Sequence, residues 1–187
     1  MTLSAQATAG VLIREATALD AEAMARVQVR SWQAAYRGII DDDYLDALSV
    51  ERRRDANLAW FERHPPSSFT RVAVDPQANV IGFAVAGEAR GHRLSTLGEV
   101  YVIYLLPDAQ RRGIGTQMMR SVARGLDLCG MHALIVWSLQ RNPARAFYEG
   151  LGGRAAQTRE TLVGRQRLGE IAYRWDELDP LMAARRR

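Results

Sequence analysis

Apolar and polar residues along this chain follow two kinds of periodicity. Short runs rich in branched and aromatic residues are typical of β-strands, whereas longer stretches with apolar residues three and four positions apart are typical of amphipathic helices. These patterns predict strands at residues 11–15, 69–74, 80–88, 97–106 and 133–138, two strands within 155–175 around Gly164, and helices at 21–36, 42–63, 113–129 and 143–151. Strand and helix alternate from residue 97 onward as a βαβα unit, which predicts a mixed α/β domain.

Capping and turn residues support several of these boundaries. Thr17 and Asp20 have the spacing of a capping box ahead of the first helix. The acidic run 41–43 suits the positive end of the second helix better than it suits a metal site. Residues 75–79 have the composition of a hairpin turn between two strands.

The segment Gln110-Arg111-Arg112-Gly113-Ile114-Gly115 lies between the strand at 97–106 and an amphipathic helix. Its glycines allow a tight turn, and the first amide groups of the following helix have no partners within the helix. Those amides also carry the positive end of the helix dipole, so the segment predicts an anion site suited to a phosphate.

Two common phosphate loops do not fit this segment. No Gly-Lys-Ser or Gly-Lys-Thr follows, which argues against a nucleotide-hydrolase P-loop. Met118 stands where a dinucleotide-binding fingerprint needs its third glycine. A glycine-rich turn without a ligand is the alternative interpretation of the segment taken alone.

A second motif follows the strand at 133–138. In the segment 140–153, Asn142 is placed to cap a helix and a proline suits its first turn. Phe147 and Leu151 are four residues apart and can face the sheet, while Tyr148 is rotated off that stripe. The hydroxyl of Tyr148 is therefore predicted to be free for a role other than packing.

Taken together, these segments resemble the GCN5-related N-acetyltransferase family. The resemblance is carried by three pieces in the family's order, at residues 98–107, 110–115 and 142–152, and residues 13–20 and 31–38 are similar to the family's opening strand and first helix. One departure is Gly153, where the family commonly has phenylalanine.

The resemblance implies a fold and a cofactor. The fold is a mixed, mostly antiparallel sheet of six to seven strands that splays between two parallel strands, with about four flanking helices. Acetyl-CoA is implied as co-substrate, with its pantetheine arm between the strands at 97–106 and 133–138 and its pyrophosphate on the amides of residues 112–116. The implied cofactor-binding residues are Ile103, Tyr104, Leu105, Gln110, Arg111, Arg112, Gly113, Ile114, Gly115, Thr116, Asn142, Ala144 and Phe147.

Two residues are candidates for catalysis. Glu99 is a carboxylate inside an apolar strand, a setting that favours a base, and strict strand alternation places it on one face with Tyr101 and Ile103. The alternative for Glu99 is an ion pair with an arginine. If Glu99 is the base, it takes the proton from the amine either directly or through an intervening water. Tyr148 matches the family's general acid, which protonates the departing thiolate; the alternative is a tyrosine packed on the cofactor arm.

Recognition of the acceptor is less well determined by the sequence. In this family the region of Trp32, Tyr36 and Arg37 shapes the acceptor pocket, and Trp137 lies on the strand before Asn142. Aromatic rings there suit an organic amine, and Arg37 suits a carboxylate or phosphate on it. Core packing is the alternative for the three aromatic residues.

Composition limits the other classes of function. All 25 basic residues are arginines against 21 acidic residues, and three of the arginines are at 185–187, so the body is nearly balanced and gives little support for nucleic-acid binding. The single Cys129 excludes an internal disulfide, is expected to pack in the core, and has no partners at metal-ligand spacing, so no metal is predicted. No apolar run is long enough to cross a membrane, and residues 1–10 do not have the pattern of a secretion signal, so a cytoplasmic protein is expected.

The chain length fits one domain at residues 11–180, between a disordered tail at 1–10 and a basic tail at 181–187. The predicted function is acetyl transfer to a primary amine of a small molecule, with both substrates bound together. A non-catalytic acyl-CoA sensor, an acetyltransferase acting on protein amines and, most weakly, an arginine-rich nucleic-acid binder are the alternatives. The sequence determines neither the acceptor, the acyl-chain preference nor self-association, a homodimer included.

Overall fold

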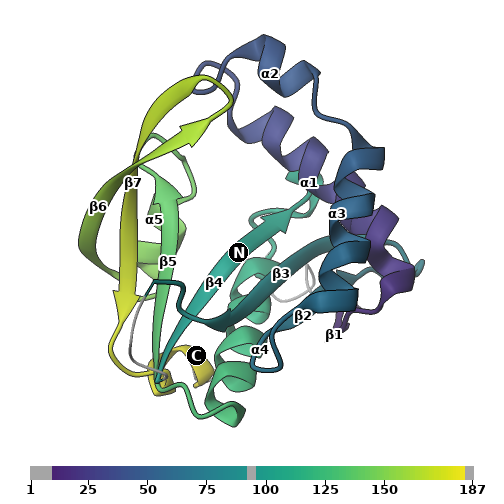
Figure 1. Cartoon of the computed structure of the whole chain (residues 1–187). Coiled ribbons are helices and arrows are strands. Elements are labelled where there is room, and N and C mark those ends of the chain that lie inside the picture. The colour runs from purple at the N-terminus through teal and green to yellow at the C-terminus, as the bar shows by residue number, and fades with distance from the viewer. Residues whose placement is uncertain (1–9, 92–95, 184–187) are drawn as a thin grey trace, which may run out of the picture.

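The computed structural model of the chain describes residues 10–91 and 96–183. Seven strands form one sheet in the order β1-β2-β3-β4-β5-β7-β6 (Figure 1). The neighbouring strands β4 and β5 run parallel, and the other neighbouring pairs are antiparallel. The strands are β1 (Leu12–Glu15), β2 (Phe69–Val74), β3 (Val80–Glu88), β4 (Leu97–Leu105), β5 (Ala133–Leu139), β6 (Arg154–Val163) and β7 (Gln166–Trp175). The α-helices are α1 (Ala21–Ala35), α2 (Asp42–Asp46), α3 (Val50–Arg63), α4 (Ile114–Leu128), α5 (Arg145–Gly150) and α6 (Asp179–Met182). The fold class expected from the sequence is confirmed.

Helices cover both faces of the sheet. On one face, α1 and α3 pack over β2, β3 and β4, with Met24, Val27 and Phe83 buried between them. On the other face, α4 presents its apolar stripe, Met118, Met119 and Val122 among others, to the same strands. The long spans of apolar residues in β3 are therefore buried from both sides, which explains why this strand lacks simple alternation.

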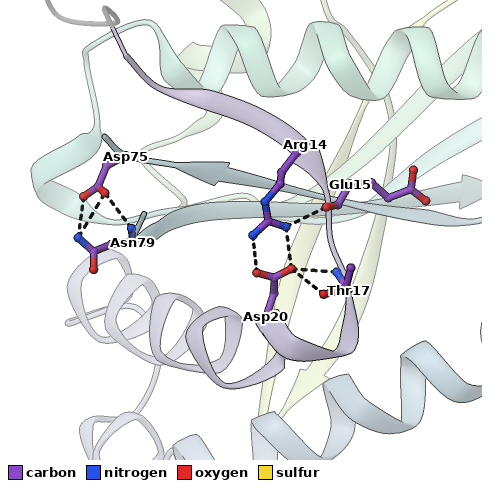
Figure 2. Close-up of polar contacts among 6 residues, drawn as sticks. All are labelled: Arg14, Glu15, Thr17, Asp20, Asp75 and Asn79. Atoms are coloured by element: carbon purple, nitrogen blue, oxygen red, sulfur yellow. Dashed lines mark hydrogen bonds and ion pairs between the residues drawn. The ribbon is translucent and has the colours of Figure 1, made fainter. Parts of the chain in front are cut away.

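The capping signal ahead of the first helix behaves as predicted. Thr17 and Asp20 form the expected capping box, in which the Thr17 amide donates to Asp20 Oδ2 at 2.8 Å (Figure 2). Arg14 donates to both oxygens of the same carboxylate, at 2.8 and 2.7 Å. Hydrogen bonding to Arg14, which outweighs the opposing effect of burial, lowers the pKa of Asp20.

The turn at residues 75–79 is the predicted hairpin between β2 and β3. Asp75 Oδ1 accepts from the amides of Gln77 and Asn79, at 2.9 and 2.8 Å. Figure 2 shows the contacts between Asp75 and Asn79. Ala78 has a φ of +66°, a conformation that this short turn imposes on a residue with a side chain. An aspartate at the start of a turn offers a side-chain acceptor for these amides, which is why it is favoured there.

The prediction of a single helix at residues 42–63 is wrong. The structure has two helices, α2 and α3, separated near Leu48 and Ser49. The Ser49 hydroxyl accepts from the Arg52 amide at 3.1 Å and caps α3, so a residue read as helix interior begins a new helix. The helix expected at 143–151 also starts later, at Arg145, because Asn142 Oδ1 accepts from the Ala144 amide at 2.8 Å and closes a turn first.

Strict alternation along β4 fails at Tyr101. In the pairing with β3, Val85 lies opposite Val102 and Ala86 opposite Val100, so Tyr101 is an extra residue in a bulge. Tyr101 and Val102 both pack toward α1 and α3, while Ile103 packs toward α4. The expectation that Glu99 shares a face with Ile103 is therefore wrong, because the bulge shifts the alternation by one residue.

The departure at Gly153 has a compensation elsewhere in the chain. Gly153 is buried, and a Cβ built on it would lie 2.6 Å from the indole ring of Trp175. The Trp175 Nε1 donates to the Leu151 carbonyl oxygen at 3.0 Å, which fixes the ring in that position. The indole therefore fills the space that a larger side chain at position 153 would need.

The expected burial of Cys129 is wrong. Cys129 is exposed at the end of α4, where its amide donates to the Leu126 carbonyl oxygen at 3.0 Å. Gly130 follows in the left-handed conformation, with a φ of +78°, and turns the chain away from the helix. The cysteine thus belongs to a helix cap and not to the apolar stripe.

The two ends of the chain are only partly described. The expected tail at residues 1–10 lies outside the described residues apart from Gly10, and the expected tail at 181–187 is described only for 181–183. Leu181 of α6 is 3% exposed and belongs to the core under α4, so the expected boundary at residue 180 falls within a packed helix.

Candidate active site

The parallel strands β4 and β5 separate along their length and open a cavity. They are paired only where Leu97–Val100 face Ala133–Val136. Beyond that point β4 stays with β3 and β5 stays with β7, so the facing edges diverge (Figure 1). The cavity between them has a volume of about 320 Å³. Diverging strand edges leave backbone amides and carbonyls without a strand partner, and these groups can bind an extended ligand.

Residues from four parts of the chain line this cavity. They are Ser31, Trp32, Ala35 and Tyr36 of α1 and the turn after it; Val100 to Leu105 of β4 with Gln110; Val136 to Leu139 of β5 with Asn142, Ala144 and Tyr148; and Thr161, Val163 and Glu170 of the β6–β7 hairpin.

The loop before α4 has the geometry of an anion site. Gly113 is the N-cap of α4 with a φ of +78°, and no side chain of the described residues caps the helix there. Arg111 also has a positive φ, +60°. A Cβ built on Gly115 would lie 3.2 Å from the Phe147 ring, so glycine lets the first turn of α4 lie against α5. The first amides of this 15-residue helix carry the positive end of its dipole, which suits an anion, and pyrophosphate binding there stays a prediction.

The predicted cofactor residues fall into two groups, with Phe147 in neither. Ile103, Tyr104, Leu105, Gln110, Asn142 and Ala144 line the cavity. The residues from Arg111 to Thr116 form the loop and first turn of α4, where Ile114 is fully buried in the core. Phe147 packs against Gly115 and does not line the cavity.

Asn142 joins the two halves of the site. Its Nδ2 donates to the Tyr36 hydroxyl at 3.0 Å, while its Oδ1 accepts from the Ala144 amide. Burial chiefly, with smaller effects of Tyr104, Tyr148 and Glu170, raises the pKa of Tyr36. The side chain of Asn142 thus fixes the α5 turn against the residue that follows α1.

Tyr148 is the most buried residue of α5 and also lines the cavity. It is 5% exposed, and its ring stacks on Tyr173 with the centroids 5.6 Å apart. The helix period placed Tyr148 off the apolar stripe of this helix. Its ring is nevertheless packed in the core, because the short α5 lies against β7. Burial chiefly, with smaller effects of Tyr104 and Tyr173, raises the pKa of Tyr148, so its hydroxyl keeps its proton at neutral pH.

Glu99 is buried in an ion pair. Its side chain is 2% exposed, and Oε2 accepts from the Arg90 amide at 2.9 Å and from Arg90 Nε at 3.2 Å. Arg90 Nη2 donates to Oε1, and the guanidinium lies 4.7 Å from the centre of the Tyr101 ring. Glu99 is not among the residues that line the cavity. Its role as base remains a prediction.

We expect Glu99→Gln to lower the free energy of unfolding by about 1–3 kcal/mol, because a buried carboxylate that accepts three hydrogen bonds is lost. Denaturant unfolding at pH 7 measures the change. Glu88→Gln on the neighbouring strand is the matched control, since Glu88 is exposed. Equal effects of the two substitutions would contradict the assignment.

The predicted acceptor residues are only partly brought together. Trp32, Tyr36 and Trp137 line the cavity. Arg37 does not: its guanidinium pairs with Asp42 at 3.2 Å and with Asp46, both on α2. The turn after α1 points Arg37 toward the acidic residues at both ends of α2, and its charge is already balanced there.

The β6–β7 hairpin supplies a wall that the sequence reasoning missed. Thr161, Val163 and Glu170 line the cavity from this hairpin. The Asp41 amide donates to Gln166 Oε1 at 2.8 Å, and this hydrogen bond holds the hairpin over the site. A carboxylate within a strand was the feature that singled out Glu99, and the same feature marks Glu170 in β7.

Metal ligands and membrane-spanning helices bear on the class of site. No cluster of three or more possible metal ligands occurs within residues 10–91 and 96–183. Over the same ranges, no helix has the length and apolar character needed to cross a bilayer.

The sequence is similar to known acetyltransferases. Residues 88–162 match the family model described as FR47-like protein. The chain is 34% identical over 172 residues to the uncharacterized N-acetyltransferase YuaI of Bacillus subtilis, covering 91% of this chain and 96% of that protein.

Solved structures share the fold. The PaiA N-acetyltransferase of Thermoplasma acidophilum, solved in complex with coenzyme A, superposes with a TM-score of 0.69 at 19% identity, over 86% of this chain and 98% of that one. A GCN5-related N-acetyltransferase from Kribbella flavida gives a TM-score of 0.68 at 20% identity, over 89% and 97% of the two chains.

Proposed function

The chain belongs to the GCN5-related N-acetyltransferase family and is an acyltransferase, and we propose that it moves an acetyl group from acetyl-CoA to a primary amine of a small-molecule acceptor while both substrates are bound. The observation that carries the proposal is the position of one cavity. It opens where β4 and β5 separate, it is lined by Tyr148, and Gln110 at its edge leads into the amides at the start of α4.

The residues divide the work of binding. The amides from Gly113 to Thr116 hold the pyrophosphate, because they lack partners within the helix and carry the positive end of its dipole. Backbone groups of β4 near Ile103 to Leu105 face the pantetheine arm and the acetyl oxygen. The side-chain Nε2 of Gln110 and the Ser31 hydroxyl both donate to the Leu105 carbonyl oxygen, at 3.0 and 3.2 Å, and so fix the end of β4.

Acetyl-CoA supplies the acetyl thioester that the acceptor amine attacks, and the carbon–sulfur bond breaks as the amide forms. Tyr148 donates its proton to the sulfur that leaves, since its raised pKa keeps the hydroxyl protonated until that step. The amine must lose a proton before or during attack. Because Glu99 does not line the cavity, its proposed role as base requires a water between the carboxylate and the amine. A Glu99→Gln enzyme with the pH–rate profile of the parent would exclude that role.

Direct transfer is preferred over a covalent enzyme intermediate. Cys129 follows the last residue of α4, and the cofactor amides are at its first residues. A 15-residue helix is about 22 Å long, so the thiol lies far from the proposed thioester. Both substrates should therefore be bound before coenzyme A is released.

An assay of coenzyme A release across a panel of small primary amines tests the proposal. We expect calorimetry to detect acetyl-CoA binding, and we expect thiol release to require an amine from the panel. Tight binding of acetyl-CoA with no amine-dependent release would contradict the proposed function and favour an acyl-CoA sensor. Release supported only by peptide amines would favour a protein acetyltransferase.

A further inference from the structure

We propose that Glu170 binds the ammonium group of the acceptor and that the site selects cationic amines with no carboxylate next to the reacting nitrogen. This inference rests on the proposed function and names the substrate class of that site. Among the described residues that line the cavity, Glu170 is the one with a charged side chain. Its side chain is 15% exposed, so the carboxylate is largely withdrawn from solvent.

The position of the carboxylate is fixed by its neighbours. Glu170 lies opposite Leu139 of β5 on one side and Arg159 of β6 on the other. Arg159 Nε donates to Glu170 Oε2 at 2.6 Å. The Arg159 guanidinium is itself held 3.9 Å from the centre of the Trp137 ring. Arg159 thus orients Glu170 through one oxygen, and we assign the other oxygen, Oε1, to the acceptor.

The remaining walls favour a cation. Trp32, Tyr36, Tyr104 and Tyr148 line the cavity, and the faces of aromatic rings attract ammonium groups; Trp137 lines it too, but one face of its ring is already covered by Arg159. Arg159 pairs with one oxygen of Glu170 and balances part of its charge, and burial makes the Coulomb attraction of the remaining oxygen for a cation stronger than the same contact in water.

An acceptor carboxylate has no matching partner in this cavity. Arg37, which the sequence suggested for that role, is engaged by Asp42 and Asp46 outside the cavity. Arg159 is not among the lining residues and is paired with Glu170. A substrate carboxylate beside the amine would therefore be desolvated close to a like charge, which discriminates against amino acids.

Matched pairs of amines test this inference. Initial rates are measured for tyramine against tyrosine and agmatine against arginine, whose only primary amine is the one next to the carboxylate, with acetyl-CoA held at saturation. We expect kcat/KM to be at least tenfold higher for the amine without the carboxylate in each pair. Equal rates within the pairs, or faster acetylation of the amino acids, would overturn the proposal.

Substitution of Glu170 supplies the second readout. We expect Glu170→Gln to lower kcat/KM for tyramine about tenfold, chiefly through the KM of the amine, with the KM of acetyl-CoA unchanged, and to reduce the preference within each pair. Glu170→Asp, which retains the charge, should keep the preference. Glu160→Gln is the control on the same hairpin, since Glu160 is exposed and pairs with Arg167. A Glu170→Gln enzyme with the parent's selectivity would overturn the proposal.

Calorimetry of tyramine with the protein in the presence of coenzyme A separates this inference from the proposed function. Binding of tyramine that weakens in Glu170→Gln, without acetylation of any amine, would overturn the proposed function and support the Glu170 site. Acetylation of amines with binding that does not depend on Glu170 would overturn the Glu170 site alone.

Discussion

Tyr148→Phe is expected to lower kcat for acetyl transfer by about 100-fold or more, because general acid catalysis typically contributes factors of this size. The substitution removes one oxygen from a ring that is 5% exposed and stacked on Tyr173, so the packing of α5 should survive. The KM of acetyl-CoA should change little, since the ring surface remains. Steady-state release of coenzyme A measures both parameters.

Tyr173→Phe is the matched control for this result. Tyr173 is the stacking partner, and its hydroxyl donates to Glu149 Oε1 at 2.7 Å and accepts from Arg145 Nε at 2.8 Å, outside the set of residues that line the cavity. We expect its loss to affect stability more than turnover. A Tyr148→Phe enzyme with the parent's kcat would leave Tyr148 as a packing residue.

The pH dependence of the reaction follows from the same hydroxyl. Burial raises the pKa of Tyr148 above its usual value of 10.0, so the acidic form is present throughout the neutral and mildly alkaline range. Deprotonation of Tyr148 should therefore cause no loss of kcat below about pH 10. An alkaline limb well below that value, absent from Tyr148→Phe, would contradict this assignment.

Gly113→Ala is expected to weaken acetyl-CoA binding about 30-fold. Gly113 has a φ of +78°, and a residue with a Cβ is strained there by about 1–2 kcal/mol. Relief of that strain moves the amides that we propose hold the pyrophosphate, and a loss of about 2 kcal/mol from charge-assisted hydrogen bonds corresponds to this factor. Calorimetry with acetyl-CoA measures the dissociation constant.

Gly130→Ala separates backbone strain from cofactor binding. Gly130 has the same φ of +78°, at the opposite end of α4, and a Cβ built there meets nothing within 4 Å. Both substitutions should lower the free energy of unfolding by a similar amount. Only Gly113→Ala should change the dissociation constant of acetyl-CoA. An equal effect of Gly130→Ala on that constant would contradict the proposed anion site at Gly113.

Much of the fold was predictable because local physics decides it. The first and last residues of β2 and β3 are those that composition and turn chemistry indicate, since Asp75 supplies the acceptors that the hairpin needs. The second helix was mispredicted because Ser49 is compatible with a helix interior and with a cap. Only its hydrogen bond to the Arg52 amide distinguishes the two.

The candidate site was predictable in part. The glycine loop and Tyr148 carry their chemistry in short motifs, so they could be located from spacing. Arg37 and Glu170 could not be separated in this way, because each is a charged residue whose role depends on what faces it. The structure brings Glu170 into the cavity and gives Arg37 two carboxylate partners outside it.

The sequence alone predicted the order of the seven strands and of most helices, the glycine turn at Gly113 and the family likeness, because periodicity, glycine placement and short motifs act over a few neighbouring residues. The tertiary structure decided which side chains share the cavity. The bulge at Tyr101 moves Ile103 to the opposite face from Glu99, and the β6–β7 hairpin carries Glu170 opposite β5. These outcomes depend on strand register and on contacts between residues far apart in the chain, which local patterns do not encode.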